Sequence, residues 1–398
     1  MTFGADLLGP YPELIAAAPP EILLPLFALL MLTAVFLVKL MAYLRIILAI
    51  TQFSYPNAFV TAKGNPCLDK ETIGRIMAAR DLADAVSETR SAGLDIGIRE
   101  IASLHEIEAA LQAFYFGECD AIEAIAPDSA KPLFRAYTTI EEAGMLKTAI
   151  RALHAGMPED AVAAALTPIG ILSTELVRSI AASRSIDDLV SPLDYTPYGS
   201  VLSPALPAYH DAGVPLPLEE ALDRFVAEEL GAVPAMLDAA DRGSAEILAG
   251  TWIDAANIRI VLRAVRDTHG GGAAGVRLLP GGYRLSVPAL QRLAESRTAG
   301  EVLGELEALR LHGNMAAAIG QFRETGSLIA VDQALDAMLL DAARDLAMLY
   351  RYGPAPLIQF LVGRRMEVQN LGILLRGIDE GFEADAIMRL TIQEEAAV

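Results

Sequence analysis

Three acidic residues and three arginines recur at one spacing, and they are the first side chains in this sequence that could support chemistry. Each acid is followed nine positions later by an arginine, in the pairs Glu142 and Arg151, Asp254 and Arg263, and Glu367 and Arg376. Nine positions place two side chains on opposite sides of a helix, so the members of a pair cannot contact each other. A catalytic site seldom needs three equal copies on one chain, and buried charges persist only when they are paired. The pattern therefore predicts structural ion pairs rather than catalysis.

Three further arginines recur upstream of the acids and offer partners for them: Arg80, Arg184 and Arg297. We expect these arginines to bridge to the three acids and to lock each copy of the pattern together.

Other chemistries lack the residues that they need. The histidines are scattered without the paired spacing of metal ligands, and Cys67 and Cys119 fit no zinc site. The glycine run at 270–275 is not followed by the Lys-Ser/Thr of a phosphate-binding loop, and the sequence contains no Gly-x-Ser-x-Gly elbow. We expect no catalytic residue, no cofactor and no metal site.

The residues between each acid and its arginine predict the helices that carry them. In the first copy Leu146, Ala149, Ile150 and Leu153 follow the spacing i, i+3, i+4, i+7, and the other two copies repeat it. This spacing is typical of an amphipathic helix with one buried face. A glycine closes each copy, as expected for a left-handed residue after a helix end: Gly156, Gly270 and Gly381. Because acid and arginine point to opposite sides, each helix should lie between two neighbours.

Two more helix patterns recur with the first, and the set of three repeats about every 112 residues. One contains the upstream arginines, and the other contains Ile107-Glu108, Leu218-Glu219 and Val331-Asp332. A period of this length indicates a repeated domain. The sequence predicts an all-α protein with repeat units at 55–165, 166–277 and 278–398, after a linker around Ser54 to Asn57. Six prolines between Pro192 and Pro217 predict short helices and loops within the second unit.

The N-terminal segment, 1–54, has a different character. A helix over about residues 22–44 would be apolar and roughly 34 Å long, enough to cross a bilayer with Lys39 reaching toward the headgroups. Acidic residues precede this helix and basic residues follow it. We therefore expect a single-pass protein of the cell membrane, with the N-terminus outside and residues 55–398 on the cytoplasmic face. The formal charge of −20 argues against nucleic acid as a partner.

The sequence also resembles a family, the C subunits of archaeal and bacterial A/V-type rotary ATP synthases, which are counterparts of the d subunit in the vacuolar ATPase. The resemblance covers residues 55–398 and rests on Tyr55-Pro56-Asn57-Ala58 with Lys63, on Asp254-Ala-Ala-Asn257-Ile258 through Leu262-Arg263, and on Glu367-Val-Gln-Asn370-Leu371 through Leu375-Arg376-Gly377. It implies three related helical domains in pseudo-threefold order that form a funnel. It also implies a non-catalytic socket that couples the membrane rotor ring to the central stalk during ATP synthesis or ion pumping.

The sequence departs from this family in two places. Met145 stands where the other copies have Asn257 and Asn370, which suggests a drifted copy. The N-terminal apolar helix is outside the usual family pattern, and either the lipid bilayer or the lumen of the rotor ring would suit it. Two alternatives stay open, a membrane-anchored helical scaffold unrelated to ATP synthesis and a membrane-tethered helical hydrolase or lipid enzyme. The enzyme would need a convergent polar pocket of titratable groups.

Overall fold

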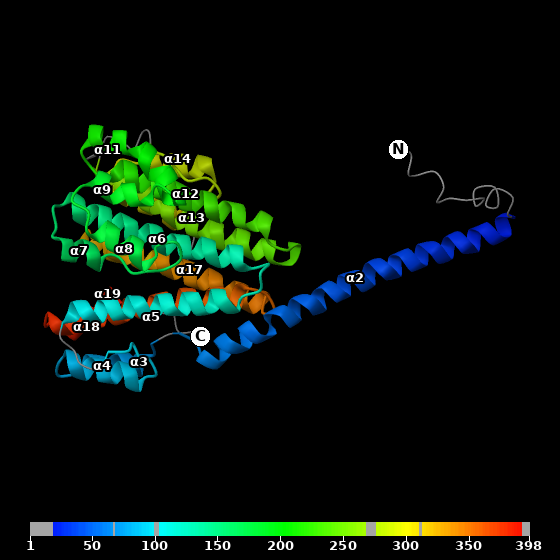
Figure 1. The fold of residues 1–398 in the computed structure, drawn as a ribbon, viewed down its shortest axis with the longest axis horizontal. Coiled ribbons are helices and arrows are strands. Elements are labelled where there is room, and N and C mark those ends of the chain that lie inside the picture. The colour runs from blue at the N-terminus through cyan, green and yellow to red at the C-terminus, as the bar shows by residue number, and fades with distance from the viewer. Residues whose placement is uncertain (1–18, 67, 99–102, 268–275, 310–312, 392–398) are drawn as a thin grey trace. The chain divides into compact units, whose positions relative to one another are not determined.

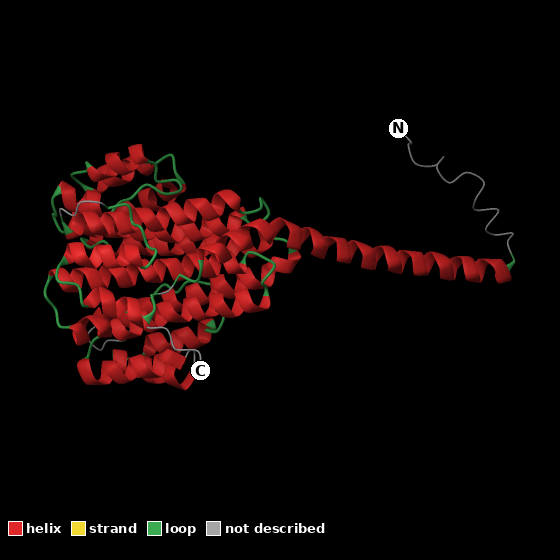
Figure 2. Cartoon of the chain, turned by 90° about the horizontal axis from the view of Figure 1, so that it is seen from below, coloured by secondary structure: helices red, strands yellow, loops and turns green. Residues whose placement is uncertain are grey.

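The structure is a computed structural model that describes residues 19–66, 68–98, 103–267, 276–309 and 313–391. The chain divides into two compact units, Met1–Ser54 and Tyr55–Val398. Every regular element in the described ranges is a helix, and a single isolated bridge joins Ile169 and Leu172 (Figures 1 and 2). The predicted all-α fold class is confirmed.

Helix α2 runs from Pro20 to Lys63 and supplies the described part of the N-terminal unit. Its stretch Leu24–Leu44 is the one helical segment among the described residues that is long and apolar enough to cross a membrane. The large apolar side chains of this stretch are exposed, as at Phe27 and Phe36. The apolar helix predicted over 22–44 is therefore present.

The linker predicted at Ser54 to Asn57 is wrong, because α2 continues through Pro56. A proline inside a helix removes one backbone hydrogen bond and tends to kink or break the helix. The helical turns before Pro56 contain additional hydrogen bonds. The hydroxyls of Thr51 and Ser54 donate to the carbonyls of Ile47 and Ile50 at 2.8 and 2.6 Å.

The body, Tyr55–Val398, contains long helices and groups of short ones. The long helices are α5 (Leu104–Ile125), α6 (Lys131–His154), α12 (Leu216–Met236), α13 (Ala239–Asp267), α17 (Ile329–Leu349) and α18 (Ala355–Asp379). The shorter helices are α3 (Lys70–Met77), α4 (Leu82–Ser91), α7 (Glu159–Ala164), α8 (Thr174–Ala181), α9 (Ile186–Val190), α10 (Pro197–Leu202), α11 (Leu206–Ala212), α14 (Val287–Glu295), α15 (Ala299–Leu309), α16 (Gly313–Thr325) and α19 (Ala384–Leu390), with 3-10 turns η1 (Ser191–Leu193) and η2 (Ser203–Ala205). The short helices predicted for the proline-rich connection are confirmed in α9 to α11.

Each repeat begins with a short helix whose start is fixed in the same way. Asp69, Ser173 and Ser286 cap α3, α8 and α14, and each side chain accepts a hydrogen bond from the backbone N–H three residues later. Such a cap satisfies one of the free N–H groups at a helix start. Capping therefore repeats together with the apolar pattern.

The six long helices of the body form a closed ring. Successive neighbours pack in the order α5, α6, α12, α13, α17 and α18, and α18 packs back against α5. Figure 1 labels these six helices, whose axes run in roughly the same direction. Each repeat contributes two of them, so the acid-bearing helices α6, α13 and α18 alternate with α12, α17 and α5. The prediction that each acid-bearing helix lies between two neighbours is confirmed.

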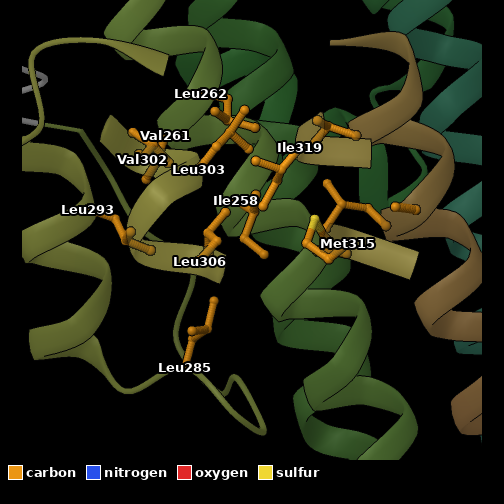
Figure 3. Packing of buried hydrophobic residues seen from close by; sticks show 14 of the residues in the cluster. Ile258, Val261, Leu262, Leu285, Leu293, Val302, Leu303, Leu306, Met315 and Ile319 are labelled. Carbon is orange, nitrogen blue, oxygen red and sulfur yellow. The ribbon is translucent and has the colours of Figure 1, made fainter. Parts of the chain in front are cut away.

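Buried apolar clusters join successive repeats. Ile258, Val261 and Leu262 of α13 pack with residues of α14, α15 and α16 from the next repeat (Figure 3). In the same way Leu371 and Leu374 of α18 pack with Ile73 of α3, so the last repeat shares a cluster with the first. The cluster around Ile258 crosses the proposed boundary at 277/278. The divisions at 165/166 and 277/278 remain predictions.

Candidate functional site

Glu142 lies in the middle of α6 and is 2% exposed. One carboxylate oxygen accepts the backbone N–H groups of Ile171 and Leu172 at 2.5 and 3.3 Å, and the other accepts the hydroxyl of Tyr198. Gly170 has φ +55, and a Cβ there would lie 2.5 Å from the same carboxylate, so the close approach requires glycine. Glu142 thus holds the segment that leads into α8.

Asp254 holds the corresponding segment of the next repeat. Its side chain, 2% exposed on α13, accepts the backbone N–H groups of Arg284 and Leu285 at 2.6 and 3.2 Å. These residues lead into α14, as Ile171 and Leu172 lead into α8. Glu142 and Asp254 therefore have the same role, since each binds the backbone of the segment that leads into a short helix of the next repeat.

Glu367 occupies the third copy of this position, on α18, and is 6% exposed. It pairs with the guanidinium of Arg364 on its own helix. Glu367, Pro66 and Leu68 line one cavity, and a Cβ on Gly363 would lie 2.9 Å from Pro66. The segment that leads into α3 therefore packs against α18 near the third acid.

Burial changes the proton affinity of all three acids. Loss of solvation raises the pKa values of Glu142, Asp254 and Glu367 above their usual range. Hydrogen bonds from Tyr198 and from the backbone oppose the rise at Glu142, backbone donors do so at Asp254, and the charge of Arg364 does so at Glu367.

The expected pairing of these acids with Arg80, Arg184 and Arg297 is wrong. Those arginines are exposed, and Arg80 instead donates its backbone N–H and Nε to Asp84 at 3.3 Å. The backbone N–H of Arg297 donates to Glu301 at 2.8 Å. The physical reason is that each arginine directly precedes the capping residue of a short helix, at the surface.

The arginines nine positions after the acids reach the neighbouring helix of the next repeat. Arg151 donates to both carboxylate oxygens of Glu219 at 2.7 and 2.6 Å, and Arg376 donates to Glu108 at 3.0 and 2.6 Å. Arg263 departs from this pattern and also binds Glu219, at 3.2 Å. Burial works to raise the pKa of Glu219, but the hydrogen bond and charge of Arg151 together with Arg263 hold it below its usual value.

In the second repeat a different arginine, Arg259, forms the ion pairs with the next repeat. Arg259 binds Asp332 at 3.2 Å and Asp336 at 2.8 Å, which links α13 to α17. The acids that receive these arginines, Glu108, Glu219 and Asp332, recur in the second helix pattern. Their recurrence was the signal in the sequence that could have identified them.

The asparagine position also has a structural role. Asn257 is fully buried and exchanges two hydrogen bonds with the backbone of Leu279, at 2.8 and 2.9 Å. Met145, at the same place in the first repeat, accepts the N–H of Thr167 through its sulfur at 3.4 Å. Asn370 is 8% exposed and lines the cavity beside Glu367. Methionine in place of asparagine in the first repeat keeps a contact with the segment that precedes α8. Its sulfur is a weaker hydrogen-bond acceptor than the amide oxygen of asparagine.

Two groups of contacts had no repeated signal in the sequence. Lys63 donates to both oxygens of Glu118 at 2.6 and 2.8 Å, which fixes the end of α2 to α5. In the second group Arg365 binds Glu141 at 3.1 Å, and Tyr115 donates to the same carboxylate at 3.1 Å. The second group joins the third repeat to the first, and neither group has a counterpart in the sequence pattern, so only the structure reveals them.

No group of three or more His, Cys, Asp or Glu side chains that could hold a metal ion occurs among the described residues. The recurring charged residues instead hold backbone segments and neighbouring helices together. Fold and site thus define an all-α protein in which one set of helix patterns occurs three times along the sequence.

Comparison with known proteins agrees with this class. The family model "ATP synthase (C/AC39) subunit" matches residues 56–390, and the chain belongs to this family. The C subunit of the A-type ATP synthase of Methanothermobacter thermautotrophicus is 27% identical over 88% of this chain and 90% of its own length. Its counterpart from Methanobrevibacter smithii is 28% identical over 87% and 90%, and that from Haloferax volcanii is 27% identical over 64% and 72%.

Proposed function

We propose that this protein is a non-catalytic rotor subunit of an A-type ATP synthase, a socket that couples the membrane rotor ring to the central stalk. The observation that carries the proposal is the family match over residues 56–390. The closed ring of long helices supports it, because a ring in which every helix has two packed neighbours resists twisting. The three repeats would form the funnel, and their recurring charges would hold it closed.

Helix α2 would attach this body to the membrane. Its exposed apolar stretch, Leu24–Leu44, fits a single span with the N-terminus outside and the body on the cytoplasmic side. We further propose that this span lies in the lumen of the rotor ring, since a single helix in free lipid would tether a rotating part to a slowly diffusing bilayer.

The experiment that tests the proposal is a purification from native membranes in mild detergent, with a tag at the C-terminus. We expect proteins of the ring, the stalk and the catalytic head to co-purify, and an unrelated tagged membrane protein serves as the control. If the chain purifies alone or with unrelated partners, the rotor assignment fails. Cysteines placed at exposed positions such as Phe27 or Phe36 then locate the span, because cross-links to ring proteins support the lumen and cross-links to lipid alone exclude it.

A further inference from the structure

A groove lies where the third repeat meets the first. Residues of α17, α18 and α19 line it, together with residues of the last turns of α2, the segment 64–69 and α3. Its lining is apolar and buried at Leu68, Leu340 and Phe360. Its volume is about 1220 Å³, whereas pockets for small ligands have volumes of about 300–1,000 Å³. The groove is therefore large enough to hold a peptide segment.

Charged side chains also line this groove. They are Lys70, Arg344, Arg351, Asp69 and Glu367. Both acids have partners within the fold, because Asp69 caps α3 and Glu367 pairs with an arginine of its own helix. Arg344 pairs with an acid of its own helix at 3.7 Å. Lys70 and Arg351 are exposed and form no ion pair with another described residue, so an acidic segment could bind them.

The end of α19 lies beside this groove. The side-chain amide of Gln333 on α17 donates to the carbonyl of Leu390, the last residue of α19. Thr391 is 4% exposed and donates its hydroxyl to the carbonyl of Met388 at 2.9 Å, and Met388 lines the groove. Contacts on both sides therefore fix the point from which the chain continues into residues 392–398, which lie outside the described residues.

The length of the 392–398 segment matches the length of the groove. On α17 the lining begins at Leu340 and ends at Met348. Met348 is 15 positions beyond Gln333, which corresponds to about 22 Å along a helix. Seven residues in an extended conformation reach about 23–25 Å. The segment can thus extend from the end of α19 along the whole groove.

The repeat pattern also directs this segment toward the groove. Helix α19 begins five positions after the end of α18, as α7 does after α6. Each buries one apolar side chain at the same place, Val162 in α7 and Ile387 in α19. The chain that follows α7 reaches Glu142 through two backbone N–H groups. Glu367, which corresponds to Glu142, lines the groove, so the chain that follows α19 should approach it in the same way.

We propose that residues 392–398 bind in this groove and fasten the third repeat to the first. The sequence Ile-Gln-Glu-Glu-Ala-Ala-Val combines apolar residues with Glu394 and Glu395, whose charges complement those of Lys70 and Arg351. The chain runs directly from α6 through α7 to α8, but no such peptide connection joins α18 to α3. The bound segment supplies this connection without a covalent bond. The inference does not depend on the rotor assignment.

Carbodiimide cross-linking of the full-length protein tests the contact, because this reagent joins a carboxylate directly to an adjacent amine. Mass spectrometry of the peptides should show Glu394 or Glu395 joined to Lys70. Lys131 and Asp128, 2.6 Å apart at the surface, provide the positive control for the reaction. Lys70→Arg keeps the charge but removes the reactive amine, so the first product should disappear and the control product should remain. If the segment is joined to Lys131 as often as to Lys70, or to no lysine, the proposal fails.

Thiol labelling tests whether the segment covers the groove. Ala347 and Ala342 are both half-buried on α17, but only Ala347 lines the groove. Reversing both charges of the segment, with Glu394→Lys and Glu395→Lys, should release it. We expect this change to raise the labelling rate of Ala347→Cys about fivefold and to leave that of Ala342→Cys unchanged. High salt should raise the rate of Ala347→Cys in the same direction.

A matched charge reversal completes the test. Glu159→Lys with Asp160→Lys makes the same change on the exposed α7, outside the groove, and should not alter the labelling of Ala347→Cys. An equal effect of the two reversals would overturn the proposal. So would shielding of Ala347→Cys that occurs only in native membranes and does not respond to the charges of the segment, because a lipid or another subunit would then occupy the groove.

Discussion

Two junctions of the helical ring use the same positions with different chemistry. The first junction connects α6 to the second repeat through Glu142 and through Arg151 with Glu219. The closing junction connects α18 to the first repeat through Arg376 with Glu108, and Glu367 lines the cavity between α18 and the segment that leads into α3. In the first, backbone N–H groups and Tyr198 satisfy the acid, whereas in the closing junction Arg364 of the same helix pairs with it.

The ion pairs differ in burial and number. The side chain of Glu219 is 8% exposed, and that of Glu108 is 31% exposed. Lys147 and Asp223 add a second pair at the first junction, but Gly372 and Gln112 occupy the corresponding positions at the closing junction. The comparison teaches that one backbone arrangement tolerates different polar contacts as long as each buried charge has a partner. At the closing junction an apolar cluster also joins α18 to α3.

The largest expected effect distinguishes how the two acids are satisfied. Glu367→Ala leaves Arg364 buried without its carboxylate and should lower the free energy of unfolding by about 3–5 kcal/mol. Glu142→Ala leaves two backbone N–H groups and a hydroxyl without their acceptor, at a cost of about 3 kcal/mol or more. Guanidinium titration of the full chain in detergent, followed by circular dichroism, measures both.

Second substitutions separate these causes. Adding Arg364→Met to Glu367→Ala removes the uncompensated charge and should restore most of the loss. Adding Tyr198→Phe to Glu142→Ala should restore little, because the backbone donors of Ile171 and Leu172 remain. Equal recovery in both double variants would contradict the distinction between the junctions.

The arginine partners should differ in the same direction. Glu219→Gln leaves Arg151 and Arg263 facing a neutral, buried side chain and should cost about 3 kcal/mol. Glu108→Gln affects one partly exposed pair and should cost less than about 1 kcal/mol. Unfolding titrations of the two variants side by side provide the measurement, and a larger loss for Glu108→Gln would reverse the comparison.

The close approach of Gly170 to Glu142 at the first junction gives a smaller effect. Gly170→Ala places a Cβ against Glu142 in a left-handed backbone conformation and should cost about 2 kcal/mol. Gly117→Ala is the control, because this exposed helical glycine has no heavy atom near its would-be Cβ. Alanine there should be neutral or stabilising by up to about 1 kcal/mol. Thermal unfolding of both variants tests the pair, and equal shifts would remove the role of Gly170.

The smallest effect is a dependence on pH of opposite sign for two acids. The folded-state pKa of Glu219 lies below its usual value of 4.5, so its stabilisation is present above that pH and is lost as the pH falls through the lower folded value. The folded-state pKa of Glu142 is raised, so its contribution is present below 4.5 and is lost as the pH rises through the raised value.

Differences between variants isolate these two contributions. The stability difference between the natural protein and Glu219→Gln should shrink as the pH falls below 4.5. The difference between the natural protein and Glu142→Gln should shrink as the pH rises above 4.5. Unfolding titrations at several pH values check both slopes, and slopes of the same sign would exclude the assigned causes.

The helices were largely predictable from the sequence, because amphipathic spacing and closing glycines are local signals. Gly156 and Gly381 do adopt positive φ, whereas Gly270 lies outside the described residues. The partners of the acids were not predictable in the same way. Glu142 and Asp254 bind backbone N–H groups about 30 residues later, and a backbone donor has no residue type that a sequence pattern can reveal.

The acids that pair with the arginines were not predicted for a different reason. Glu108 and Glu219 were visible as recurring acids in the second helix pattern, but their nearness to Arg376 and Arg151 depends on the helices forming a closed ring. Arg263 shows the remaining difficulty. It binds Glu219 together with Arg151. From the repeat one would expect it to bind Asp332, but Arg259 binds that acid instead.

Closure of the ring between α18 and α5 also has a consequence for biosynthesis. Arg376 and Glu108, which meet there, are 268 positions apart in the chain. The cluster that buries Ile73 of α3 includes Leu371 and Leu374, so it cannot be completed until α18 has been synthesised. Contacts this distant in sequence slow folding and leave apolar surface exposed in the meantime. The first helices of the body to leave the ribosome are thus among the last to be fully buried.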